Sequence, residues 1–156
     1  VWLSPELDIA MAEIICDALM QTFPADAATF RANAAALKEK FSAKKAEIAG
    51  KLAGREEKVF FVYHPAFGYF ADAFQLEQVS VECGGREIDP AQMGRIVREM
   101  RRRTDPVLFV QKQFSPSSGR ALQEQCGARL VEVDPLDENL FTLFDTLADA
   151  LEPPKK

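Results

Sequence analysis

Apolar residues near the start of the chain recur at helical spacing, and the residues before them mark where the helix begins. Ser4, Pro5 and Glu6 supply an N-cap, a proline at the first helical position and an acid in the first turn. We therefore predict a first helix that begins at Pro5 and ends before Pro24. Its apolar positions are Leu7, Ala10, Ile14, Ala18 and Leu19.

A second and longer helix is predicted over residues 25–53, which are rich in the helix-favouring residues alanine, lysine and glutamate. Its apolar residues form a heptad-like stripe. They are Phe30, Ala34, Leu37, Phe41, Ile48 and Leu52. At 1.5 Å per residue this helix is roughly 40 Å long, which exceeds the width of a small domain. We therefore expect it to pack against two bodies, and we favour this over a helical hairpin with its own partner.

After a polar break at residues 54–58, short apolar runs alternate with helical patterns. The runs predict strands at 59–63, 78–82, 107–111 and 129–133. Asp89 and Ser115, each followed by proline, predict helix starts, and Gly127 predicts the end of the second of these helices. A last helix is expected at 138–151. Because helices separate the strands, we predict an α/β fold: a four-stranded parallel sheet with flanking helices, preceded by a long backbone helix.

Composition narrows the functional classes. The chain has 156 residues, enough for one ordinary domain with a core. Its net charge of -5 and pI near 5.0 argue against nucleic acid as a partner, since phosphate binding needs a basic face. No apolar run approaches the length needed to cross a bilayer. The chain opens on Val1 rather than methionine, so we expect a processed or truncated piece of a longer protein.

The cysteines give little evidence of chemistry. There are three, Cys16, Cys83 and Cys126, and no C-x-x-C motif occurs. This set is typical of small buried side chains rather than of a disulfide framework, a redox motif or a thiolate zinc site. Whether two of the three cysteines form a disulfide is not decided by the sequence.

Polar residues gather where the predicted strands end. In a parallel sheet these ends share one rim, and ligands bind beyond it. The rim residues are His64, Glu82, Cys83, Gln111, Gln113 and Asp134. Imidazole and carboxylate are suitable zinc ligands, so His64 and Asp134 are the candidate metal residues. The local sequence is also compatible with purely structural roles: His64 as a hydrogen-bonded histidine at a strand end, and Asp134 as a cap of the turn before Pro135. Two ligands are too few for a closed zinc site, which takes four.

An enzyme is the alternative interpretation. His64 and Asp134 could act as acid and base at the strand ends of a Rossmann-like domain. The chain contains no G-x-G-x-x-G or G-x-x-x-x-G-K phosphate loop and no G-x-S-x-G nucleophile motif, which disfavours this class. A third interpretation is an interaction module that binds a partner helix through an open apolar stripe.

Five motifs in order resemble one known family, the solute-binding proteins of bacterial zinc and manganese ABC importers. Residues 1–5 resemble its motif His-x-Trp-Leu-Ser/Asp-Pro, entered just after the histidine. Phe23 departs from the family, which usually has aspartate at the start of its long helix. The remaining motifs also match at suitable spacing. The five stretches are VWLSP (1–5), FPADAATFRAN (23–33), YHPAFGYF (63–70), FVQKQFSP (109–116) and VEVDPL (131–136).

The resemblance implies two α/β lobes joined by a rigid helix, with metal held between the lobes. Residues 1–23 would be the last helix of a missing N-terminal lobe, 24–53 the interlobe helix and 54–152 the C-terminal lobe, with a tail at 153–156. His64 would be a direct metal ligand and Asp134 a carboxylate ligand, bound directly or through water. A second lobe and a histidine before Val1 would supply the ligands that are missing here.

The function implied by the resemblance is capture and delivery without catalysis. A histidine at the position of His64 favours zinc over manganese. The protein would bind zinc in the periplasm and hand it to an ABC-transporter membrane permease, with no role for nucleic acid. Because only neutral imidazole ligates a metal, affinity should fall as the pH falls. With the N-terminal lobe absent, we also expect the chain to self-associate and to bind zinc weakly.

Overall fold

A computed structural model of the chain describes residues 1–83, 86–87, 89–113 and 123–153. The elements run in the order α1 (Pro5–Thr22), η1 (Pro24–Asp26), α2 (Ala27–Lys51), β1 (Val59–Val62), α3 (Gly68–Ala73), β2 (Glu77–Ser80), β3 (Glu82–Cys83), β4 (Arg86–Glu87), α4 (Pro90–Arg101), β5 (Val107–Gln111), β6 (Arg129–Val133) and α6 (Leu140–Leu151). None of the helices in these ranges is long and apolar enough to cross a membrane.

Three of the predicted helix ends are confirmed, and the long helix is two residues shorter at each end, Ala27–Lys51, than predicted. The side chains of Ser4 and Asp89 each accept a hydrogen bond from a backbone N–H three residues later, so both are N-caps. Gly127 has a φ of 70° and ends the short helical stretch 123–126. The predicted start at Ser115 lies outside the described residues. The last helix begins two residues later than expected because Asn139 is its N-cap.

All four predicted strands form one parallel sheet in the order β2-β1-β5-β6, which confirms the fold class. The second strand ends at Ser80, earlier than expected. Glu82–Cys83 instead pairs antiparallel with Arg86–Glu87 in a small hairpin. Two-residue strands carry no periodic signal, so the sequence did not reveal this hairpin. The short helix α3 was also not predicted.

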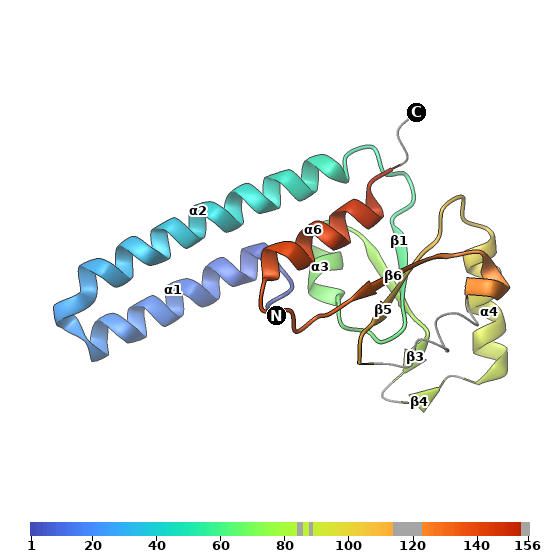
Figure 1. Cartoon of the computed structure of the whole chain (residues 1–156), viewed down its shortest axis with the longest axis horizontal. Helices are drawn as coiled ribbons and strands as arrows, with labels where there is room; N and C mark the ends of the chain where they lie inside the picture. The colour runs from blue at the N-terminus through green and yellow to red at the C-terminus, as the bar shows by residue number, and fades with distance from the viewer. Residues whose placement is uncertain (84–85, 88, 114–122, 154–156) are drawn as a thin grey trace.

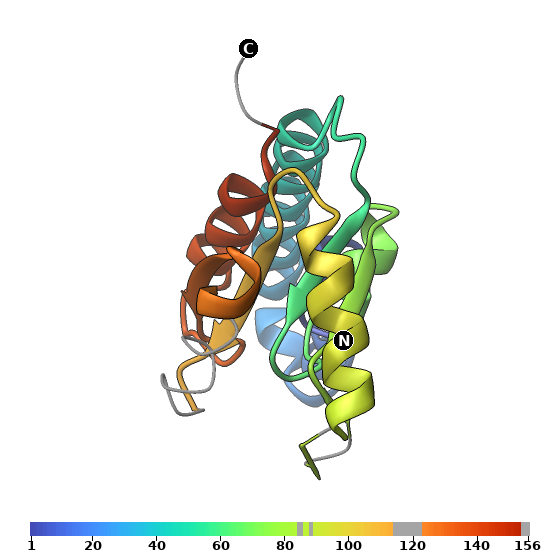
Figure 2. The same ribbon diagram turned by 90° about the vertical axis from the view of Figure 1, so that its right-hand side faces the viewer.

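The sheet is covered on both faces, because alternate residues of each strand point to opposite sides. Phe60 and Phe109 point toward the layer made by α6, α3 and the C-terminal part of α2. Phe61 and Leu108 point the other way, onto α4. Figure 2 shows α4 and α6 on opposite sides of the strands. The continuous burial of β1 and β5 explains why both read as unbroken apolar runs.

The two long helices form an antiparallel hairpin that extends away from the sheet (Figure 1). The C-terminal part of α2 packs on the lobe, where Ile48 is fully buried and Phe41 stacks on Phe141 of α6 at 4.9 Å. The N-terminal part of α2 pairs with α1, through ion pairs such as Lys38 to Glu13 at 2.7 Å. The helical hairpin, which the sequence pattern ranks below packing on two bodies, is thus present: α2 packs on α1 and on the helix α6 of the lobe.

The apolar stripe of α2 is covered over its C-terminal part. Phe41, Ile48 and Leu52 are buried, and Leu37 packs against the same core. Nearer the start of α2, Phe30 and Ala34 are only partly buried and line a groove between α1 and α2. The third interpretation, in which the stripe would bind a partner helix, therefore stays a prediction.

Candidate metal site at the carboxyl ends of the strands

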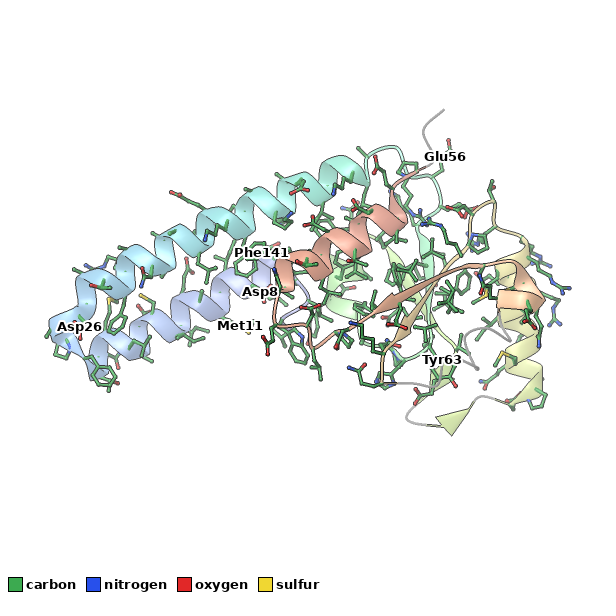
Figure 3. The ribbon with its side chains drawn as sticks, in the orientation of Figure 1. Asp8, Met11, Asp26, Glu56, Tyr63 and Phe141 are labelled. Carbon is green, nitrogen blue, oxygen red and sulfur yellow. The ribbon has the colours of Figure 1, made fainter. Side chains whose placement is uncertain are left out.

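His64 lies just beyond the carboxyl end of β1, after Tyr63, which Figure 3 labels at that end of the strand. Its backbone is fixed by Gln111, the last residue of β5. The His64 N–H donates to Oε1 of Gln111 at 3.2 Å, and Nε2 of Gln111 donates to the His64 carbonyl at 2.6 Å. Gln111 is 1% exposed. A buried side-chain amide therefore continues the sheet pairing by one residue and holds the histidine at the rim.

The imidazole of His64 is bonded to a buried carboxylate. Its Nδ1 lies 2.8 Å from Oε2 of Glu82, and the two side chains are 40% and 6% exposed. The Glu82 N–H donates to the Tyr63 carbonyl at 2.9 Å, so pairing with the end of β1 sets Glu82 beside the histidine. The donor and acceptor roles in this contact depend on the tautomer of the ring. In the tautomer in which Nδ1 donates to Glu82, Nε2 carries the lone pair.

Asp134 follows β6 on the same rim. Its Oδ1 accepts from Nε2 of Gln113 at 2.8 Å and from the Leu136 N–H at 3.0 Å. These bonds, first that of Gln113, and the nearby charge of Lys112 hold the pKa of Asp134 below its usual value. The carboxylate is therefore ionised at neutral pH and able to bind a cation.

The N-terminal segment also reaches this rim. The indole Nε1 of Trp2 donates to the Pro135 carbonyl at 2.9 Å, immediately after Asp134. Val1 and Trp2 line a cavity of about 410 Å³ together with Pro65 and Ala66, the residues that follow His64. The sequence analysis missed this contact because 133 positions separate its two residues and no local pattern joins them.

The structure places both predicted metal residues at one edge of the sheet, on strands that flank β5. Each is bonded to a glutamine at the end of β5: His64 to Gln111 and Asp134 to Gln113. Within the described part of the chain, no three His, Cys, Asp or Glu side chains are grouped so that they could hold a metal ion. His64 and Asp134 therefore stay candidate ligands, on one rim and not part of such a group among the described residues.

Two of the cysteines carry no disulfide. Cys16 and Cys126 are buried thiols, and the sulfur of Cys126 lies 3.2 Å from that of Met100. Cys126 precedes β6, at the edge of the sheet opposite His64. The side chain of Cys83 lies outside the described part of the structure.

The sequence predicts that Glu82 and Gln111 lie at the rim, but it does not predict a functional role for either residue. A role beside the histidine could have been suspected from the sequence, because each is a polar residue at the end of an apolar strand that neighbours the strand of His64. Neither partner could be assigned, because the pairing register of the strands is a tertiary property.

Comparison with known proteins gives a consistent result. The profile of the family described as "ZnuA: Zinc-uptake complex component A periplasmic" matches residues 1–152. The chain is 26% identical over 142 residues to the "High-affinity zinc uptake system protein ZnuA" of Haemophilus influenzae, covering 90% of this chain and 42% of that protein. It is 28% identical over 150 residues to the "Zinc-binding lipoprotein AdcA" of Streptococcus pneumoniae, covering 95% of this chain and 30% of that protein.

Solved structures share the fold. The crystal structure of ZnuA superposes with a TM-score of 0.91 at 26% identity, covering 97% of this chain and 60% of that one. The structure of AdcAII from Streptococcus pneumoniae gives a TM-score of 0.80 at 26% identity, covering 95% and 60%. The chain thus spans less than two thirds of the length of these relatives. Since the family profile matches nearly its whole length, the chain belongs to the ZnuA family of zinc-uptake solute-binding proteins.

Proposed function

We propose that this chain forms the C-terminal portion of a periplasmic solute-binding protein that captures zinc and delivers it to an ABC-transporter permease. The observation that carries the proposal is the position of His64: a half-exposed imidazole at the carboxyl end of a buried strand, bonded through Nδ1 to a buried carboxylate. Metal-ligating histidines commonly donate their second ring N–H to such a carboxylate. Membership of the zinc-uptake family supports the choice of cargo and of partner.

His64 and Asp134 are the proposed zinc ligands. A neutral imidazole nitrogen and an ionised carboxylate both suit zinc, and the imidazole disfavours manganese, which prefers oxygen ligands. An ion bound by both residues would lie over the end of β5, the strand between them. We propose that the other ligands come from outside this chain, from a second lobe and from a histidine preceding Val1. The bond of Trp2 to Pro135 supports the latter, because it holds the start of the chain at the rim.

The proposed domain organisation follows the same family pattern. Residues 1–23 would belong to an N-terminal lobe, residues 24–53 would connect two lobes, and residues 54–152 would form the metal-binding C-terminal lobe. The hairpin of α1 and α2 supports this division, since it extends beyond the sheet (Figure 1). The protein would hold and release zinc without turnover of a substrate.

The test is a zinc titration of the chain, with affinity measured by competition with a weak chelator. We expect weak binding, and at least about tenfold weaker binding by the His64→Ala variant, because a coordinating imidazole is lost. Asp134→Asn should weaken binding less, since the amide oxygen remains. Affinity of the unmodified chain should also fall on acidification, because only neutral imidazole ligates zinc.

The matched control moves the histidine. His64 is the only histidine of the chain, so the double variant His64→Ala with Gln123→His keeps one imidazole at an exposed position away from the rim. This variant should bind no better than His64→Ala alone. Equal zinc binding by all variants would reject the proposal and favour the enzyme alternative, with His64 and Asp134 as acid and base.

A further inference from the structure

The buried carboxylate of Glu82, which contacts His64, is only partly hydrogen-bonded among the described residues. The Glu82 side chain is 6% exposed, and its Oε2 lies 2.8 Å from the imidazole Nδ1. Its other oxygen, Oε1, is buried and has no hydrogen-bond partner among the described residues. Among the residues that the structure describes, the Glu82 side chain therefore makes one charged contact, through one of its two oxygens.

Packing alone does not account for a glutamate here. A buried polar group without a partner costs on the order of 1–3 kcal/mol, and more when it is charged. An apolar side chain of the same length would avoid that cost, because Val81 next to it is already buried in the apolar core. The side-chain contact that Glu82 does make, among the described residues, is to His64.

Gln111 fixes the backbone of His64, and Glu82 contacts its ring. Gln111 bonds both the N–H and the carbonyl of His64. The ring is 40% exposed, so packing leaves part of it in solvent. Its rotation and tautomer depend on what its nitrogens bind, and the bond to Glu82 orients the ring through Nδ1.

We propose that Glu82 is a positioning residue of the zinc site, which keeps the proton of His64 on Nδ1 and directs Nε2 to the metal. This inference rests on the proposed function, because it assumes that zinc binds His64. Glu82 itself does not ligate zinc. A carboxylate that accepts from the second ring N–H of a metal-ligating histidine generally strengthens metal binding.

The first test reads the tautomer without metal. In a ¹⁵N-labelled sample the ring nitrogens of His64 are assigned at once, because no other histidine is present. At alkaline pH, where imidazole is neutral, we expect the proton on Nδ1 in the unmodified chain. Glu82→Met should move it to Nε2, whereas Glu82→Gln, which keeps an acceptor oxygen, should retain it on Nδ1. An unchanged tautomer in the methionine variant would overturn the proposal.

The second test measures zinc affinity by chelator competition. Glu82→Met should bind about 10–100-fold more weakly than the unmodified chain, and Glu82→Gln should lie between them. The control Glu77→Gln removes an exposed carboxylate from the neighbouring strand β2 and should change nothing. If the unmodified chain binds no zinc, the proposed function fails, while the tautomer still tests the role of Glu82. If it binds through His64 and Glu82→Met binds equally well, only the positioning role fails.

Two further measurements distinguish a positioning role of Glu82 from direct metal binding and from a role in stability. The absorption spectrum of bound cobalt reports the ligand set, and we expect the same spectrum at saturation in the unmodified and Glu82→Gln chains. Loss of a ligand in that spectrum would show that Glu82 binds the metal directly, contrary to the proposal. Thermal unfolding of Glu82→Met should occur at the same temperature or higher; a large decrease would show that Glu82 serves the fold.

Discussion

Buried polar residues differ in how completely the fold satisfies them. Gln111 uses both ends of its amide on His64. Glu82 and Asp8 each leave one buried carboxylate oxygen without a hydrogen-bond partner among the described residues. Asp8 lies on α1 where this helix approaches α6, near Phe141 (Figure 3). Burial raises the pKa of Asp8 to about 7 from 3.8. The ionisation of Asp8 therefore links the stability of the fold to pH.

Asp8 should make the chain less stable as the pH rises. Between pH 3.8 and about 7 the folded state keeps a proton that the unfolded state releases, so the free energy of unfolding falls through this window. Asp8→Asn removes the ionisation and should raise stability at about pH 8 by about 1–3 kcal/mol, with little gain near pH 4. Urea unfolding at both pH values measures the effect. Asp17→Asn, an exposed change on the same helix, is the control and should give no such difference.

At the scale of elements, the end of α2 decides how the chain enters the sheet. The helix ends at Lys51, and Gly54 has a φ of 80°, a left-handed conformation that glycine adopts without strain. Charged pairs then hold α2 against α6: Lys44 with Asp145 and Lys51 with Asp149, both at 2.7 Å. A turn and two ion pairs therefore orient the hairpin on the lobe.

Two glycines in this region should respond to alanine with opposite signs. Gly50 lies within α2, where alanine favours the helix, so Gly50→Ala should stabilise the chain by about 0.5–1 kcal/mol. Gly54→Ala should destabilise it by about 1 kcal/mol, because alanine is strained at positive φ. Neither added methyl group has an atom within 4 Å, so new packing contacts contribute to neither variant, and the two differ only in backbone conformation. Thermal or urea unfolding of the two variants checks the signs, and a shared sign would refute the backbone argument.

At the scale of the whole molecule, the hairpin leaves apolar surface uncovered. Ile14 and Ile15 on α1 are 69% and 58% exposed. An apolar groove of about 590 Å³ runs between α1 and α2 and is lined by residues such as Phe30 and Leu37. Contiguous apolar surface of this kind favours association in water. The sheet, by contrast, is covered on both faces.

We therefore expect the chain to self-associate through the hairpin. Sedimentation velocity over a concentration series should show a species larger than a monomer. Replacing both isoleucines, Ile14→Gln with Ile15→Gln, should shift it toward monomer, because glutamine favours helices but removes apolar surface. Leu136→Gln is the matched control: Leu136 is 66% exposed but lies in the loop after β6. A monomeric unmodified chain at all concentrations would contradict this prediction.

Local patterns were enough to predict most elements of the fold. The four strands, the caps at Ser4 and Asp89 and the end at Gly127 depend on periodicity and on residues next to each other in the chain. The rim position of His64 and Asp134 followed from parallel pairing alone. Elements with weak local signals, the hairpin of β3 and β4 and the short helix α3, were missed for the same reason.

The sequence by itself determined the fold class and, through five ordered motifs, the family. The tertiary structure decided which residues meet: Glu82 with His64, Gln113 with Asp134, and Trp2 with Pro135. These contacts join positions 18 to 133 residues apart, and they depend on strand register and on the path of the chain between strands. Side-chain bonds across strands have no local signature, so the partners of a site residue become visible only when the strands are placed side by side.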